Sequence, residues 1–235
     1  MKKKIIIIIS SVVGALLLSF AVICILCIIV DNNQIKEAKK KEIVYGDFKY
    51  AIAIDKPDYK TAYLVGLSDE GKKKDEIVVP FLINGYIIQG FCVDFSYDCD
   101  FRTAKTIYLG AINYQCGYMK IGENTTIYGG DHYIYKKVLK TNSKQYVTEH
   151  QANIIKEKYK DHNNVFQASV VFDITYYDTS WEYISNAENG KITQVPEFDY
   201  KNLDYRFDGW YNGETRWNLA TDVVTDNIVL EAKWR

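Results

Sequence analysis

The feature that most constrains this chain is an uninterrupted apolar run close to its N-terminus. Residues 5–30 read IIIIISSVVGALLLSFAVICILCIIV, 26 residues without a charged side chain. As an α-helix this run would extend about 39 Å, which exceeds the roughly 30 Å thickness of a bilayer's hydrocarbon core. The run therefore predicts a transmembrane helix that binds membrane lipid directly and crosses with some tilt.

The same run is typical of a signal anchor that is not removed. A cleavable signal peptide has an apolar core of roughly 7 to 15 residues, followed by small residues at the cleavage site. Here the core is longer, and the sequence IIVDNNQ at its end offers no such site. Lipoprotein processing is also disfavoured, because Ile23 and Leu26, which are not small, precede Cys24 and Cys27.

Lysines flank the run on both sides, at positions 2–4 and again at 36 and 39–41. Because the positive-inside rule counts both groups, charge alone gives a weak orientation signal. We expect residues 1–4 to be a cytoplasmic tail and the body to lie outside the cell, mainly because of a resemblance described below. Residues 31–42, DNNQIKEAKKKE, are largely polar and predict a juxtamembrane stalk.

The charge of the chain argues against a nucleic-acid partner. The formal net charge is -1, and it is more negative once the N-terminal lysines are set aside. Nucleic-acid binding needs a basic patch or stripe, which this composition does not provide. We therefore expect no contact with nucleic acid.

Short β-like patches recur through residues 43–166. They are IVVP from residue 77, TIYLG from 106, TIYGG from 126 and QYVT from 145. Recurrence every 20 to 30 residues is typical of a solenoid with one strand per repeat. The patches resemble degenerate leucine-rich repeats of the BspA type, most closely in residues 62–91, where IVVP leads into an NGY turn and a second strand.

One soluble helix is predicted at residues 150–160, HQANIIKEKYK. Ala152, Ile155 and Tyr159 fall on one face at helical spacing. The following DHNN breaks this pattern and favours a domain boundary near residue 166.

Beyond this boundary the pattern changes to strand period. SVVFDITYYDT alternates, NAENGK predicts a turn, and Asn-Gly at 212–213 predicts a hairpin, because both residues tolerate positive φ. The alternation is clearest in the last strand. Its apolar side carries Ile228, Leu230, Ala232 and Trp234, and its other side is mostly charged.

Residues 167–235 resemble the Listeria–Bacteroides repeat, also called the internalin B-repeat. The family pattern runs from an opening strand through GWY and W-x-x-x-T-x-x-V-T-x-N-x-x-L to a terminal A-K-W. The matching residues are Phe207, Gly209, Trp210, Tyr211, Trp217, Thr221, Val224, Thr225, Asn227, Leu230, Ala232, Lys233 and Trp234. The resemblance implies a β-grasp-like unit of a bacterial surface protein.

Together these patterns predict a mainly β (α+β) protein. It would have an N-terminal transmembrane helix, a short leucine-rich-repeat-like β region over 43–166 and a C-terminal β-grasp-like repeat over 167–235. Trp210, Trp217 and Trp234 are expected in a small aromatic core, because a unit of about 65 residues needs large side chains to bury enough area.

Trp181 and Tyr183 lie outside the motif and are the candidate binding residues. Core packing is the favoured interpretation for Trp181, but an aromatic platform that stacks on sugar rings stays open for both.

No catalytic constellation is evident in the sequence. None of the three histidines belongs to an H-E-x-x-H motif, and there is no P-loop, G-x-S-x-G or G-x-G-x-x-G. Asp131 next to His132 suggests an acid–base pair, although a turn after a strand is the favoured interpretation. We expect no enzyme activity and no cofactor.

No metal site is expected either. Asp94, Asp98 and Asp100 lack the glycine and terminal glutamate of an EF-hand loop, which favours a solvated loop. Cys92 and Cys99 could form a bridge, but buried free thiols are the favoured interpretation.

The expected function is that of a membrane-anchored bacterial cell-surface protein for adhesion or protein–protein interaction. The alternative is a surface carbohydrate-binding module that uses exposed aromatic residues. In either case the partner would be an extracellular protein or glycan.

Overall fold

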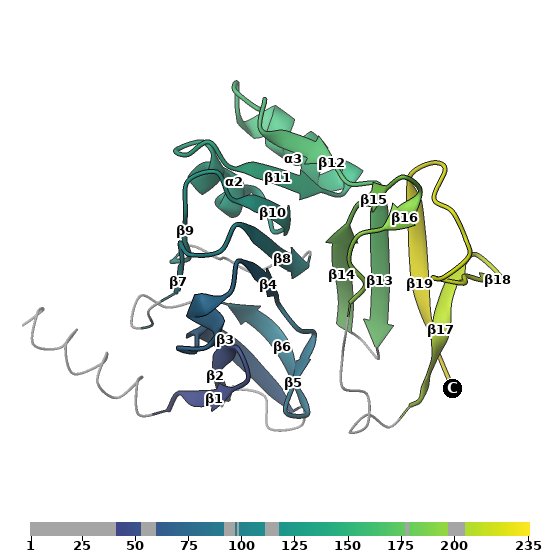
Figure 1. Cartoon of the computed structure of the whole chain (residues 1–235), viewed down its shortest axis with the longest axis horizontal. Coiled ribbons are helices and arrows are strands. Elements are labelled where there is room, and N and C mark those ends of the chain that lie inside the picture. The colour runs from purple at the N-terminus through teal and green to yellow at the C-terminus, as the bar shows by residue number, and fades with distance from the viewer. Residues whose placement is uncertain are drawn as a thin grey trace, which may run out of the picture. The chain divides into compact units, whose positions relative to one another are not determined.

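The computed structural model of the chain describes residues 41–52, 60–91, 97, 99–110, 118–176, 179–196 and 205–235 (Figure 1). By its internal contacts the chain divides into residues Met1–Lys41 and Glu42–Arg235, and the second unit is described below. It is mainly β, as the sequence predicts, with many short strands and two α-helices among the described residues.

Neither α-helix in the described part of the chain is long and apolar enough to cross a membrane. The predicted anchor at residues 5–30, the tail before it and most of the predicted stalk lie outside the described residues. The anchor therefore stays a prediction.

A five-stranded parallel sheet contains all four of the recurring patches. Its strands are β4 (Glu76–Val78), β8 (Thr106–Gly110), β10 (Thr126–Gly129), β11 (Lys144–Val147) and β12 (Val165–Gln167). They pair in the order β12-β11-β10-β8-β4, and every pair is parallel. Figure 1 shows these strands following one another in chain order. The prediction that the patches are successive strands of one stack is confirmed, and β12 adds a fifth that the patches did not reveal.

The register of this sheet separates a core face from an aromatic face. On the core face the aligned and buried residues are Ile77, Ile107, Ile127, Gln145 and Val165. One position further along, the aligned residues are Val78, Tyr108, Tyr128, Tyr146 and Phe166. Successive side chains of a strand point to opposite faces, so this second row lies on the other side of the sheet.

In the sequence, the strands of a second sheet come before β4 and between β4 and β8. It consists of β1 (Ile43–Tyr45), β2 (Phe48–Ile52), β3 (Thr61–Leu67), β6 (Tyr86–Phe91) and β5 (Leu82–Ile83), in that order. β5 and β6 are joined by Asn84 and Gly85, both with positive φ, which confirms the predicted NGY turn. A short 3-10 helix (Gly71–Lys73) and a parallel pair, β7 (Asp100–Phe101) with β9 (Lys120–Ile121), complete this part.

The helices are α2 (His132–Val138) and α3 (Glu149–Lys158). α3 begins one residue before the predicted start, because Thr148 caps its N-terminus by accepting a hydrogen bond from Gln151 N. It ends two residues before the predicted end. Ala152 and Ile155 are buried on its inner face as expected. The sequence did not predict α2, which Asp131 caps by accepting from Tyr133 N and Ile134 N.

The C-terminal sheet has the strand order β14-β13-β19-β17-β18. Its strands are β13 (Val170–Tyr176), β14 (Thr179–Ser185), β17 (Phe207–Asn212), β18 (Thr215–Arg216) and β19 (Ile228–Trp234), and a small hairpin of β15 (Ala187–Glu188) and β16 (Lys191–Ile192) lies beside them. β13 and β19 are parallel, whereas the outer pairs are antiparallel. The alternation expected for the last strand holds at its centre, where Leu230 is buried between exposed Val229 and Glu231.

The hairpin predicted at residues 212–213 exists, but its loop is displaced by one residue. Asn212 pairs with Thr215, so Gly213 and Glu214 form the two-residue loop. Gly213, the first residue of this loop, has φ 59, a positive value that glycine adopts readily. Asn212 therefore belongs to β17, and only Gly213 uses the left-handed conformation.

An aromatic ladder connects the parallel sheet with the C-terminal sheet. It runs from Tyr183 on β14 to Tyr108, Tyr128, Tyr146 and Phe166. The successive ring centroids are 5.9, 4.5, 4.9 and 5.3 Å apart, and the rings are stacked. Buried residues of both sheets belong to one hydrophobic cluster. The two predicted β regions therefore share a core.

Cys99 is fully buried and disulfide-bonded. The interpretation of this residue as a free thiol is therefore wrong. Cys92 and Cys116 lie outside the described residues, so a bridge between Cys92 and Cys99 stays a prediction.

Candidate functional site

Trp181 and Tyr183, the residues proposed from the sequence as a sugar platform, are both buried. Their side chains are 3% and 2% exposed. The Trp181 ring packs edge-on against Phe81 at 5.4 Å, and Tyr183 stacks on Tyr108. Because β14 covers the parallel sheet with this face, neither ring is open to an outside ligand. The favoured core-packing interpretation of Trp181 is confirmed, and the alternative of an exposed platform at these two residues is ruled out.

The three tryptophans of the C-terminal motif differ in burial. Trp210 is buried, as expected, whereas Trp217 and Trp234 are only half-buried. Trp234 also donates a hydrogen bond from Nε1 to Thr175 O at 2.9 Å. The core prediction therefore holds fully for Trp210 alone.

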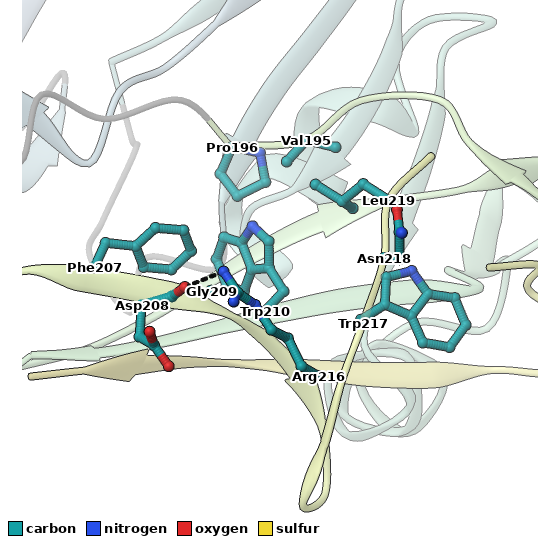
Figure 2. A pocket seen from close by; sticks show the side chains of 10 residues that line it. All are labelled: Val195, Pro196, Phe207, Asp208, Gly209, Trp210, Arg216, Trp217, Asn218 and Leu219. Carbon is teal, nitrogen blue, oxygen red and sulfur yellow. Dashed lines mark hydrogen bonds between the residues drawn. The ribbon is translucent and has the colours of Figure 1, made fainter. Parts of the chain in front are cut away.

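An open pocket of about 770 Å³ lies on the C-terminal sheet. This volume lies within the range of small-molecule sites, roughly 300 to 1,000 Å³. Its lining comes from β17, from the end of β18 and the residues that follow it, and from the segment after β16 (Figure 2). The lining residues are Val195, Pro196, Phe207, Asp208, Gly209, Trp210, Arg216, Trp217, Asn218 and Leu219.

Aromatic and aliphatic side chains form the floor and walls of this pocket. Phe207 and Trp210 pack edge-to-face with ring centroids 5.2 Å apart, and Phe172 supports Trp210 from the core at 4.7 Å. In Figure 2, Trp210 lies between Phe207 and Trp217. Leu219 is 41% exposed at the rim. The pocket thus offers apolar surface that is held rigidly from below.

The hairpin of β17 and β18 positions the polar residues. Tyr211 pairs with Arg216, and Trp217 N donates to Trp210 O at 2.8 Å, so the chain after the turn runs back along β17. The pairing of β17 with β19 shifts register between Phe207 and Gly209. Such irregularities redirect side chains and are frequent beside functional sites.

Arg216 lies across β17 because Gly209 has no side chain. Gly209 has φ +157, and a Cβ there would lie only 2.9 Å from Arg216 Nε. The guanidinium donates from Nη2 to the backbone carbonyl of Asp208 at 2.6 Å, as the dashed line in Figure 2 shows. Within the described part of the chain Arg216 has no ion pair, so its charge is held in place without being neutralised.

The carboxylate of Asp208 is already engaged. It accepts a hydrogen bond from Tyr211 Oη at 2.7 Å and forms an ion pair with Arg235. The Tyr211 hydrogen bond, together with the charges of Arg235 and Arg216, lowers the pKa of Asp208 below its ordinary value. Asp208 therefore stays ionised, with Arg235 as its counter-ion.

Asn218 adds an amide at the rim of the pocket. Its Oδ1 accepts from Ala220 N at 3.0 Å, and its backbone N donates to Asp222 Oδ2 at 2.7 Å. Among the described residues its Nδ2 has no partner, which leaves two N–H donors for a ligand.

Asp131 and His132 do not form the acid–base pair considered from the sequence. The Asp131 carboxylate caps α2, and burial raises its pKa against the effect of these two backbone N–H groups. His132 Nε2 instead lies 2.9 Å from Lys158 Nζ, and burial and this lysine lower the His132 pKa. In the described contacts no hydrogen bond joins the two side chains.

The predicted acidic loop is only partly described. Asp94 and Asp98 lie outside the described residues. Asp100 forms a two-point contact with Arg102, at 2.8 and 2.5 Å, and the Arg102 hydrogen bond lowers the pKa of Asp100 to about 2. Its partner is thus a neighbouring arginine in the same turn.

No protein-family model matches the chain, and no curated protein or solved structure matches it. The chemistry of the pocket therefore has to be argued from its own residues. Sequence reasoning assigned Trp210 and Trp217 to an aromatic core, and it gave no role to Arg216, Asp208 or Asn218. The available signal was the Asn-Gly turn, which brings residues on either side of it together.

Proposed function

We propose that this chain is a membrane-anchored bacterial cell-surface protein that binds a partner outside the cell and performs no catalysis. Adhesion or protein–protein interaction is the role that fits best. The observation that carries the proposal is the open aromatic pocket. It combines an apolar floor with an Arg216 charge that has no ion pair, and an Asn218 Nδ2 that has no partner, in the described residues.

The extracellular location is supported by the disulfide at Cys99. Disulfides persist in oxidising compartments and are rare in the cytosol of most organisms. The apolar run at residues 5–30 supplies the proposed signal anchor, which would leave residues 1–4 in the cytoplasm.

The repeat assignments remain part of the proposal and have structural support. The parallel stack of one strand per repeat fits a degenerate leucine-rich-repeat-like region. In the C-terminal sheet the first and last strands pair in parallel at the centre with a hairpin on either side, which fits a β-grasp-like internalin B-repeat. The GWY of the motif falls on β17, where each residue has a distinct structural role.

A surface carbohydrate-binding module is the second candidate. The observation that favours it is again the pocket, since a half-buried Trp217 ring and unused amide and guanidinium donors suit the apolar faces and hydroxyl groups of sugars. The candidate thus moves from Trp181 and Tyr183 to the hairpin of β17 and β18.

Surface accessibility tests the primary proposal. Intact cells that express the full chain with a tag after Arg235 would be treated with an antibody against the tag, beside cells with the same tag on a cytoplasmic protein. Labelling without permeabilisation is the expected result. Protection of the tag until the membrane is broken would overturn the extracellular location and with it the adhesion role.

A further inference from the structure

We propose that the pocket on the C-terminal sheet recognises an acidic saccharide, with Arg216 binding its carboxylate and Trp217 supporting its ring. This inference rests on the second candidate function above. It deepens that candidate by naming the ligand class and by assigning a selectivity residue.

The charge of the pocket favours an anion. Two ionisable side chains line it, Asp208 and Arg216. Their charges act on each other, but only Asp208 has an ion pair in the described residues. Asp208 is paired with Arg235, whereas Arg216 donates to a carbonyl and has no ion pair in the described residues. A ligand carboxylate would supply the missing counter-ion, and a guanidinium suits that partner because its planar fork offers two parallel N–H donors.

The position of Arg216 is fixed before any ligand arrives. Its Nη2 is tied to Asp208 O, and the bare backbone of Gly209 lets it lie close to β17. A side chain that is held in its bound geometry loses less conformational entropy on binding. Arg216 is therefore a positioned anion receptor, unlike an ordinary surface arginine that moves freely.

The remaining lining favours a sugar ring as the body of the ligand. Sugar rings carry apolar C–H faces and polar edges, and the pocket presents both kinds of surface side by side. Trp217 and Leu219 offer apolar area, while Asn218 Nδ2 offers two donors beside them. At about 770 Å³ the pocket has room for more than one ring.

A peptide strand fits this site less well. Recognition by strand addition needs a row of unpaired backbone groups along a sheet edge. The edge strand here is β18, which comprises only Thr215–Arg216, and the pocket is lined mainly by side chains. The observations therefore favour a ligand that is read by side chains.

The test compares two oligosaccharides that differ only in the acidic group. Full-length chain in nanodiscs of zwitterionic lipid would be titrated with a β-1,4-linked glucose tetramer and with a β-1,4-linked glucuronic acid tetramer, by calorimetry and tryptophan fluorescence. We expect the acidic tetramer to bind at least about ten-fold more tightly at low salt. The preference should shrink as salt is added, because exposed charges are screened.

Three variants assign the roles. Arg216→Gln should remove the preference while weak binding of the neutral tetramer remains. Asn218→Asp can still accept from Ala220 N. It should weaken binding of the acidic tetramer selectively, because the new carboxylate repels the carboxylates of the ligand. Lys144→Gln, which removes an exposed cation on β11, is the matched control and should leave both affinities unchanged.

Each outcome decides a separate claim. Equal binding of the two tetramers, or a preference that survives Arg216→Gln, would overturn the acidic ligand but keep the carbohydrate-binding candidate. Binding of neither tetramer would overturn both the acidic ligand and that candidate. The surface location is tested separately by antibody access. A failure of the surface proposal can therefore be told apart from a failure of the binding proposals.

Discussion

Glu182 shows how a single side chain sets a pH dependence. It lies on β14 directly opposite Asp173 on β13. Burial raises its pKa above the ordinary value, the charge of Asp173 raises it further, and His150 acts in the opposite direction. The folded state therefore holds the proton more tightly than the unfolded chain does. The stabilisation is complete below the unfolded pKa of about 4.3 and is lost as the pH rises through the folded value.

Glu182→Gln is expected to stabilise the chain at neutral pH by about 0.5 kcal/mol, which is the size of the penalty for like charges directly opposite in a sheet. Urea unfolding at pH 4 and pH 7 would measure it. The gain should be smaller at pH 4, where Glu182 is largely protonated already. Glu157→Gln on α3, at an exposed glutamate, is the control. An equal gain in stability from Glu182→Gln at both pH values would contradict the raised pKa of Glu182.

Among the elements, the aromatic ladder has the largest structural role. Tyr128 stands between Tyr108 at 4.5 Å and Tyr146 at 4.9 Å. Burial and the neighbouring tyrosines raise its pKa to about 12, so it stays neutral throughout the physiological range. The ladder lets four strands of the stack and β14 pack through one continuous set of rings.

Tyr128→Leu is expected to cost about 1 to 3 kcal/mol, because it removes two stacking contacts that are each worth roughly 0.5 to 1.5 kcal/mol. Tyr128→Phe keeps both stacks but removes the hydroxyl that hydrogen-bonds with Asn186. It should cost less than about 1 kcal/mol, the usual contribution of one such bond. Chemical unfolding of the full chain in detergent compares the two. Similar losses would show that the hydroxyl, and not the stacking, stabilises this row.

The turns illustrate what the sequence could and could not predict. Of the three Asn-Gly pairs, those at 84–85 and 189–190 have positive φ at both residues and form the loops that the dipeptide favours. At 212–213 the loop is displaced, because the pairing of Tyr211 with Arg216 fixes the register of the hairpin. Local propensity thus predicts that a turn exists, whereas partner strands decide its position.

The candidate site depends even more on tertiary contacts. Trp181 and Tyr183 are two residues apart on one strand, so the sequence does place them on one face. Which face is covered depends on the parallel sheet, which the local pattern does not contain. Likewise, no local pattern reveals that Arg216 reaches the carbonyl of Asp208 or that Gly209 leaves room for it.

The whole unit from Glu42 to Arg235 is expected to unfold as one body, because its sheets share a core in which the disulfide-bonded Cys99 is buried. Reduction, or Cys99→Ser, should lower its stability by about 2 to 4 kcal/mol. Thermal unfolding with and without reductant would measure this, and peptide mapping without reduction would identify the bonded partner.

Cys92→Ser and Cys116→Ser form a matched pair for the same question. The substitution that reproduces the loss of stability identifies the cysteine bonded to Cys99, and the other should be nearly neutral. Alkylation of Cys99 in the native, non-reduced protein would contradict the bond.

The junction between the parallel sheet and the C-terminal sheet bears, under the proposed surface role, on how the protein would be shed from a cell. Only Ala168 and Ser169 separate β12 from β13. Ala168 is buried and donates to Val147 O, and Ser169 is held by Asn186 and Ile228. A protease needs an extended, accessible segment, and this junction offers none. A cut at this junction is therefore not expected to separate the C-terminal sheet from the parallel sheet, and under the proposed surface role the two would be released together.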